Sequence, residues 1–252
     1  NGVAVVEGET PNQAMLNGFR APTVYGVKNN APAAYAYFDG EAPGTVIDIA
    51  PWPGGGNFAN AAEIVVGSNG EEMYEVDNSG AARHINLMDG TVTSLGNVGV
   101  LANAMGLDYT TGIYYATDGN SLFTIDFEEV TSTNVGSLGS GAGNLMIGMT
   151  FDQDGNLYMY DIVIDQLWSC DKETGACTQI GSIGFDANFG QGMAWDQGLG
   201  MPVMSAFNNG AFACEYRTVD VTTGMSTFVG NIGSPGQTQM GTICIPVTGG
   251  RG

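Results

Sequence analysis

Carboxylates recur at one place in a pattern that repeats along this chain, and paired carboxylates are the groups that cleave glycosidic bonds. Asp108, Asp152 and Asp196 each follow a short apolar segment. A glycosidase needs an acid and a nucleophile or base whose surroundings hold different pKa values. Carboxylates that are repeated by symmetry beside turns are instead typical of side chains that cap those turns. We therefore predict no catalytic residue and keep a glycoside hydrolase as an alternative.

The segment from Asp152 to Asn156 is the best candidate for a metal site. Its sequence, Asp-Gln-Asp-Gly-Asn, places oxygen-bearing side chains alternately around a glycine turn, as in the first half of a calcium loop. The glutamate that closes such a loop is missing, because Val163 stands in its place. The same side chains can satisfy backbone donors in a hairpin turn. We expect no cofactor, with calcium at Asp152, Asp154 and Asn156 as the alternative.

Two further kinds of site are disfavoured by the residues present. His84 is the single histidine, which excludes a zinc site built from several histidines, and no second base stands ready for a triad with Ser or Cys. The run Gly54-Gly55-Gly56 lacks the Lys-Ser/Thr pair that follows the glycines of a nucleotide-binding loop.

Aromatic and amide side chains in loops are candidates for ligand binding. Trp52 and Asn57 lie in a segment rich in proline and glycine, and Phe185 and Asn188 lie in a corresponding segment further along the chain. An aromatic ring can stack on a sugar while an amide bonds its hydroxyls. We predict these four residues as ligand-binding, with core packing as the alternative for Trp52.

The chain holds four cysteines, an even number that is compatible with export to an oxidising compartment. Cys170 and Cys177 flank a predicted hairpin turn, where facing positions can meet disulfide geometry. We therefore predict a bridge between them. For Cys214 and Cys244 two outcomes stay open: a second disulfide that staples neighbouring units, or a pair of buried free thiols.

The elements that must position these residues follow from an internal repeat. Four segments share the pattern Thr-x-apolar-Gly-(Ser/Asn)-apolar-Gly, and their leading glycines lie 40, 45 and 49 residues apart. A unit of this length that carries strand-type residues is typical of a β-propeller. An apolar strand that ends in Asp before a turn recurs as a second marker. The four segments are Thr93–Gly99, Thr133–Gly139, Thr178–Gly184 and Thr227–Gly233.

Each unit supplies four short strands, so the sequence predicts an all-β, five-bladed propeller of four-stranded antiparallel blades. One blade is split between the chain ends, which closes the ring and removes exposed strand edges. Residues 1–22 lack both markers and are predicted to form an N-terminal extension with one short strand, Val3–Val6. Residues 23–252 form the propeller domain, with blades at 23–60 plus 241–248, 61–105, 106–147, 148–191 and 192–240.

The unit Gly148–Gly184 resembles the repeats of secreted bacterial β-propeller proteins. In these, Phe-Asp-x-x-Gly-x-Leu-Tyr opens a blade and Asp-x-x-Thr-Gly-x-x-Thr-x-Ile-Gly closes it, and both patterns stand in this unit. The resemblance covers roughly residues 62–240 and implies the fold. The units at 62–105 and 192–240 lack the Leu-Tyr step, so the resemblance transfers no site residue.

The composition of the chain restricts the kinds of partner that the protein can bind. The formal charge of −20, from 26 acidic and 6 basic residues, opposes binding to nucleic acid or to an anionic membrane surface. No apolar run approaches the roughly 18 residues that span a bilayer, and removal of an export signal would account for the start at Asn1.

The sequence therefore predicts a non-enzymatic, extracellular structural or adhesive module. It self-associates through its terminal strands or binds an extracellular glycan or protein. Two alternatives remain open: a carbohydrate-binding lectin that uses inter-blade pockets, and a glycoside hydrolase with carboxylates in the central channel.

Overall fold

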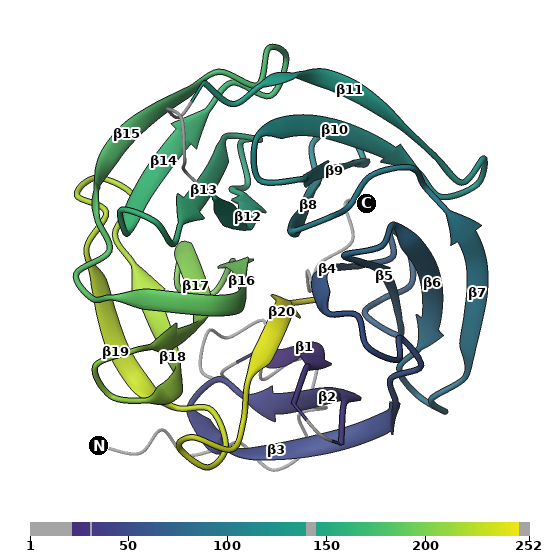
Figure 1. Ribbon diagram of the computed structural model, residues 1–252, viewed down its shortest axis with the longest axis horizontal. Coiled ribbons are helices and arrows are strands. Elements are labelled where there is room, and N and C mark those ends of the chain that lie inside the picture. The colour runs from purple at the N-terminus through teal and green to yellow at the C-terminus, as the bar shows by residue number, and fades with distance from the viewer. Residues whose placement is uncertain (1–21, 31, 140–144, 247–252) are drawn as a thin grey trace, which may run out of the picture.

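The computed structural model describes residues 22–30, 32–139 and 145–246, and these form five four-stranded antiparallel sheets arranged round a central axis (Figure 1). The predicted five-bladed β-propeller is confirmed. No helix in this described part of the chain could cross a membrane. The predicted extension at residues 1–22, with its strand Val3–Val6, lies outside the described residues apart from Pro22.

The blades are numbered from the N-terminus, and their strands are given from the axis outward. Blade 1 holds β20 (Met240–Cys244), β1 (Thr23–Lys28), β2 (Ala34–Asp39) and β3 (Ala42–Pro51). Blade 2 holds β4 (Ala59–Ile64), β5 (Glu72–Asp77), β6 (Ala81–Asn86) and β7 (Val92–Asn97). Blade 3 holds β8 (Ala104–Asp108), β9 (Ile113–Thr117), β10 (Ser121–Asp126) and β11 (Thr131–Ser137). Blade 4 holds β12 (Met146–Phe151), β13 (Leu157–Asp161), β14 (Gln166–Cys170) and β15 (Cys177–Ser182). Blade 5 holds β16 (Ala187–Asp196), β17 (Met201–Asn208), β18 (Ala213–Val219) and β19 (Ser226–Asn231).

The ring closes where the two ends of the described chain meet, as predicted. Strand β20 pairs antiparallel with β1, and Gly26 lies opposite Ile243 (Figure 1). The backbones approach so closely here that a methyl group at Gly26 would overlap the carbonyl oxygen of Thr242, and one at Gly192 would overlap the Thr242–Ile243 backbone. Glycine is therefore required on both sides of β20.

The core lies between the blades. The innermost strands β4, β8, β12 and β20 are buried at every residue, because both of their faces pack against neighbouring blades. The outermost strands β7, β11 and β15 are mostly exposed or half-buried. This gradient explains why the inner strands read as continuous apolar runs and the outer strands as polar ones.

The repeated segment has a structural cause in the four outermost strands that carry it, β7, β11, β15 and β19. Its leading glycine follows a β-bulge and packs against the next blade, so that a methyl group at Gly136 or Gly181 would overlap the carbonyl oxygen of Thr174 or Thr223. The next apolar residue, such as Leu138 in blade 3, is fully buried. The last glycine of each copy has a positive φ, between 60° and 87°. The repeat is therefore the contact between adjacent blades.

The two ends of the ring are named by the direction of the innermost strands. We call the end where β4, β8, β12, β16 and β20 begin the start face, and the end where they finish the end face. The turns after the innermost strands, at Asp108, Asp152 and Asp196, therefore lie on the end face. The loops that contain Trp52 and Phe185, which precede β4 and β16, lie on the start face.

Candidate functional site

The carboxylate of Asp108 is fully engaged. Its Oδ1 accepts hydrogen bonds from the backbone N–H and the hydroxyl of Thr110, at 2.9 and 2.6 Å. Its Oδ2 accepts from the Thr111 hydroxyl at 2.9 Å and from the Lys172 ammonium of blade 4 at 2.6 Å. Burial raises the pKa of Asp108, but these hydrogen bonds, that of Lys172 foremost, outweigh it and lower the pKa. Asp108 therefore joins blades 3 and 4 through its ion pair with Lys172.

Asp152 and Asp196 cap turns in the same way. Asp152 Oδ1 accepts from the backbone N–H groups of Asp154 and Asn156, at 2.9 and 2.8 Å, and its Oδ2 accepts from the Asn156 amide at 2.7 Å. Asp196 Oδ1 accepts from two backbone N–H groups of its turn. Within the described ranges no three His, Cys, Asp or Glu side chains are grouped to hold a metal ion. Calcium at Asp152, Asp154 and Asn156 stays a prediction.

The cysteines divide into two kinds. Cys170 and Cys177 are directly opposed on β14 and β15 and form the predicted disulfide. Cys214 and Cys244 do not pair. Both are buried free thiols, and they lie in separate clusters of the core. Of the two outcomes that the sequence left open, the structure has the buried free thiols, because each thiol packs into a different inter-blade layer.

Trp52 is buried and offers no exposed face to a ligand. Its ring packs against Gly54 and lies 5.5 Å below the Arg83 guanidinium. Arg83 in turn bonds the buried carboxylates of Glu75 and Asp77, both at 2.8 Å. The surroundings of Trp52 are thus a charged contact between blades 1 and 2, which is the packing alternative of the sequence prediction.

The other predicted ligand residues lie on the start face without forming one pocket. The Asn57 amide donates to the Ser79 hydroxyl at 3.3 Å in blade 2. Phe185 is half-buried, and the Arg217 guanidinium lies 4.5 Å above its ring. Asn188 donates its amide to the Asn209 side chain at 3.3 Å and accepts from the Phe189 backbone N–H. Asn188 borders an exposed aromatic surface, because it directly precedes Phe189.

That surface consists of two phenylalanines in blade 5. Phe189 and Phe212 are 49% and 64% exposed, and both have a positive φ, of 64° and 51°. Each ring stands edge-on to the buried Phe207, with centroids 5.0 and 5.4 Å away at 81° and 85°. We call this pair, with Phe207 behind it, the aromatic platform. A bulky residue with positive φ is a backbone outlier, and such strain collects at functional sites.

Polar side chains border the aromatic platform. The Asn209 amide donates to both carboxylate oxygens of Asp186 at 3.2 Å, and Asn209 Oδ1 accepts from Asn188. The Asn209 backbone N–H also donates to the Asp186 carbonyl oxygen at 2.9 Å. Amide and carboxylate groups are thus held beside two exposed rings.

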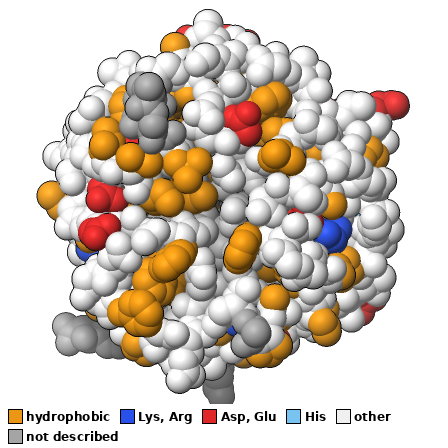
Figure 2. Space-filling model, in the orientation of Figure 1, with side chains coloured by type: hydrophobic (Ala, Val, Ile, Leu, Met, Phe, Trp, Pro, Cys, Tyr) orange, Lys and Arg blue, Asp and Glu red, His pale blue; other side chains and the backbone are white. Residues whose placement is uncertain are grey.

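Figure 2, which views one end of the ring, shows hydrophobic side chains gathered round a central hollow with few basic ones among them.

Sequence reasoning did not assign Phe189 or Phe212. Phe189 lies inside a bulge of β16, where the pairing with β17 skips from Asn188 to Gly192. Phe212 ends the turn between β17 and β18. An aromatic residue beside glycine and asparagine in a turn was the available signal, but its exposure depends on the bulge, which the repeat pattern does not encode.

Comparison with known proteins supports the fold. No protein-family model and no curated protein matches the chain. A chain of a nidogen/laminin complex superposes with a TM-score of 0.59 at 11% identity, covering 89% of this chain and 99% of that one. A structural genomics protein of unknown function from Bacteroides thetaiotaomicron gives 0.57 at 15% identity, covering 90% and 65%. Virginiamycin B lyase from Staphylococcus aureus gives 0.48 at 14% identity, covering 80% and 68%. At these identities the likeness to the first two structures shows the propeller fold alone.

Proposed function

We propose that this protein is a non-enzymatic extracellular module that binds neutral carbohydrate on the aromatic platform and thereby serves a structural or adhesive role. The observation that carries the proposal is the pair Phe189 and Phe212, two exposed rings held by left-handed backbone. Each such conformation costs about 1–3 kcal/mol in a non-glycine residue. Because the fold keeps these unfavourable backbone conformations and leaves both apolar rings exposed, we infer that the rings bind a ligand and that this binding offsets the cost.

The chemistry of the platform suits a sugar. The C–H face of a pyranose is apolar and stacks on an aromatic ring, while its hydroxyls need donors and acceptors at the edge. Asn188, Asn209 and Asp186 supply both kinds of group next to the rings. Phe207 fixes the rings from behind, so little side-chain entropy is lost on binding.

Two observations support the remaining parts of the proposal. The three symmetric carboxylates each accept hydrogen bonds from the backbone of their own turn, and Asp108 also pairs with Lys172, an arrangement typical of turn caps rather than of a catalytic acid and base. The disulfide Cys170–Cys177 persists in an oxidising compartment, which supports a location outside the cell.

The test is binding to an array of neutral oligosaccharides, followed by titration of the best ligand. Phe189→Ala and Phe212→Ala should each weaken binding at least about tenfold, the loss of roughly 1.4 kcal/mol of stacking. The matched control is Phe228→Ala, since Phe228 is also 49% exposed but lies on the outermost strand β19. Thermal unfolding of each variant checks that the fold persists.

The proposal fails if the intact protein binds no neutral glycan, or if Phe228→Ala weakens binding as much as the platform variants. It also excludes the hydrolase alternative, so the protein should release no reducing ends from a broad polysaccharide panel. Hydrolysis by the intact chain that Asp196→Asn abolishes would show a catalytic carboxylate instead.

A further inference from the structure

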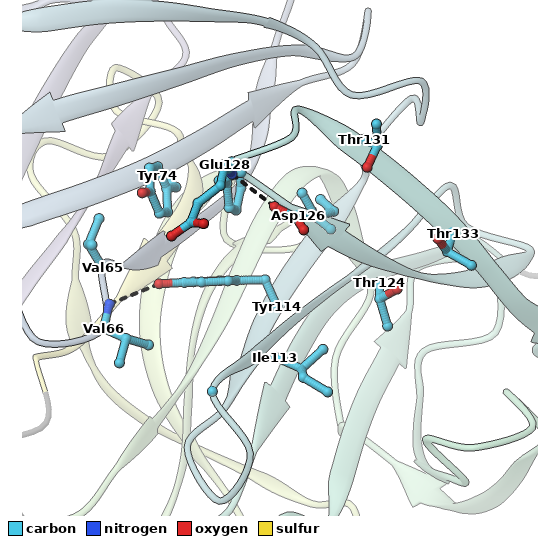
Figure 3. Close-up of a pocket in the computed structure, with 13 residues that line it drawn as sticks. Val65, Val66, Tyr74, Ile113, Tyr114, Thr124, Asp126, Glu128, Thr131 and Thr133 are labelled. Carbon is cyan, nitrogen blue, oxygen red and sulfur yellow. Dashed lines mark hydrogen bonds between the residues drawn. The ribbon is translucent and has the colours of Figure 1, made fainter.

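A second surface lies on the end face, between blades 2 and 3. It is an open groove of about 590 Å³, and Figure 3 shows its side chains converging from both blades. Blade 2 and its first turn contribute Val65, Val66 and Tyr74. Blade 3 contributes Gly112, Ile113, Tyr114, Thr124, Ile125, Asp126, Phe127, Glu128, Thr131 and Thr133. This volume lies within the range of small-molecule sites.

Aromatic rings form the inner part of the groove. Tyr74 stacks on Phe127 with centroids 4.0 Å apart and planes 14° apart, and Tyr114 stands edge-on to both. The Tyr114 hydroxyl donates to the Ile64 carbonyl at 3.1 Å and accepts from the Val66 N–H at 2.9 Å. These contacts join the two blades and fix the rings before any ligand arrives (Figure 3).

The charged groups of the groove are all negative. Asp126 and Glu128 line it, and no Lys, Arg or His does. Asp126 Oδ1 accepts from the Glu128 and Glu129 N–H groups at 2.9 and 3.0 Å, while its Oδ2 has no partner in the described chain. The Glu128 carboxylate likewise bonds no described side chain and lies on the side of Tyr74 (Figure 3). Burial is the largest cause that raises the pKa of Tyr74, and the negative charges of Glu72 and then Glu128 raise it further.

The rest of the groove mixes hydroxyl and aliphatic side chains, with Thr124, Thr131 and Thr133 on the outer strands of blade 3. Val66 and Ile113 are both exposed, although each is an aliphatic side chain, and they come from different blades. The groove thus combines an apolar wall, a fixed aromatic cluster and two carboxylates without countercharge. An anion would be repelled by these carboxylates, whereas a cation is attracted by them and by the net charge of −20.

We propose that this groove binds a small alkylammonium compound. The ammonium pairs with Glu128 and Asp126, and the alkyl chain lies over Val66, Ile113 and the edge of Tyr74. This site is separate from the aromatic platform in blade, face and ligand chemistry. Its success or failure is therefore independent of the proposed carbohydrate binding.

The test is an NMR titration of the full chain with 1,5-diaminopentane, following the resonances of Tyr74 and Phe127. Saturable shifts are expected at these rings. Glu128→Gln should weaken binding at least about fivefold, and Ile113→Ser should weaken it while leaving the charges in place. The matched control is Glu129→Gln, because Glu129 is the neighbouring exposed acid and does not line the groove.

Two comparisons identify the interaction. The neutral isostere 1,5-pentanediol should cause no saturable shift, since it lacks the ammonium groups. Magnesium chloride at equal ionic strength should not reproduce the shifts, since it lacks the alkyl chain. Equal weakening by Glu128→Gln and Glu129→Gln, or equal shifts with magnesium, would show diffuse attraction to an acidic surface and overturn the proposal.

Discussion

Two glutamates in blade 2 are buried, and their ionisation changes the stability of the folded protein. Glu63 on β4 is almost completely buried, and its carboxylate accepts only the N–H of Ile64, so burial raises its pKa to about 8. Glu75 on β5 is fully buried beside Arg83, and burial raises its pKa to about 7 despite that cation. Around Glu63 lie Tyr109 and Cys244, both neutral groups whose own pKa is raised by burial.

The raised pKa values of these two carboxyls determine how stability changes with pH. Between about pH 4.5 and pH 8 the folded protein binds more protons at these sites than the unfolded chain does, so stability falls as the pH rises. We expect the free energy of unfolding to decrease by several kcal/mol across this window, since each unit of pKa difference between the folded and unfolded states corresponds to about 1.4 kcal/mol. Urea unfolding at a series of pH values measures it.

Glu63→Gln should reduce the slope of that profile, because the amide cannot ionise and only Glu75 then contributes. Glu71→Gln is the control, since Glu71 is an exposed acid in the same blade and should leave the slope unchanged. A wild-type stability that stays level or rises between pH 5 and pH 8 would show that these carboxyls are not protonated in the folded state.

Residue-level function was the least predictable part of the chain. The sequence identified Asn188 but not its neighbour Phe189, because exposure of that ring depends on a bulge in β16. Trp52 shows the reverse. Its proline- and glycine-rich segment reads as an exposed loop, yet the ring folds back onto Gly54 beneath Arg83. Side-chain direction in loops is set by contacts between blades, which a single sequence does not display.

At the scale of the element, the hairpin β14–β15 was predictable from spacing alone. Cys170 and Cys177 stand at the two ends of a turn, and directly opposed positions on paired strands bring their sulfurs together. Cys214 and Cys244 were not resolvable in this way, because no local turn relates them. Their burial in separate clusters keeps both as thiols, and burial raises the pKa of Cys214 to about 12.

Thiol titration tests this assignment. The native protein should expose no reactive thiol, the denatured unreduced protein two, and the denatured reduced protein four. Replacing both Cys170 and Cys177 by serine should lower stability by at most about 2 kcal/mol, since the closed loop is short. Finding no thiol in the denatured unreduced protein would mean that Cys214 and Cys244 are oxidised.

At the scale of the whole molecule, the number of blades and the closure were predictable because the repeat is a physical contact. Each of the four copies places a glycine where the next blade's outer turn packs, and the second marker, an apolar strand that ends in Asp, supplied the fifth blade. The split blade followed from the same count, since β20 supplies the strand that β1 to β3 lack. The domain boundary at residues 22 and 23 stays a prediction.

One added methyl group at Gly26 should weaken the closure of the ring. Gly26→Ala forces a side chain into the Thr242 carbonyl, and we expect a loss of about 3 kcal/mol or more, because neither backbone can move aside. Gly44→Ala on β3 is the control, since nothing lies within 4 Å of the added carbon. Chemical unfolding compares the two, and equal stability of Gly26→Ala and Gly44→Ala would contradict the observed pairing of β1 with β20.

The central claim, that the start face of blade 5 recognises carbohydrate, is tested most directly by photo-crosslinking. A neutral oligosaccharide that binds the protein is fitted with a photoreactive group, irradiated in complex and mapped by peptide mass spectrometry. We predict labelling in the peptides that contain Phe189 and Phe212, abolished by excess unmodified sugar. Labelling confined to other blades, or undiminished by the competitor, would contradict the account.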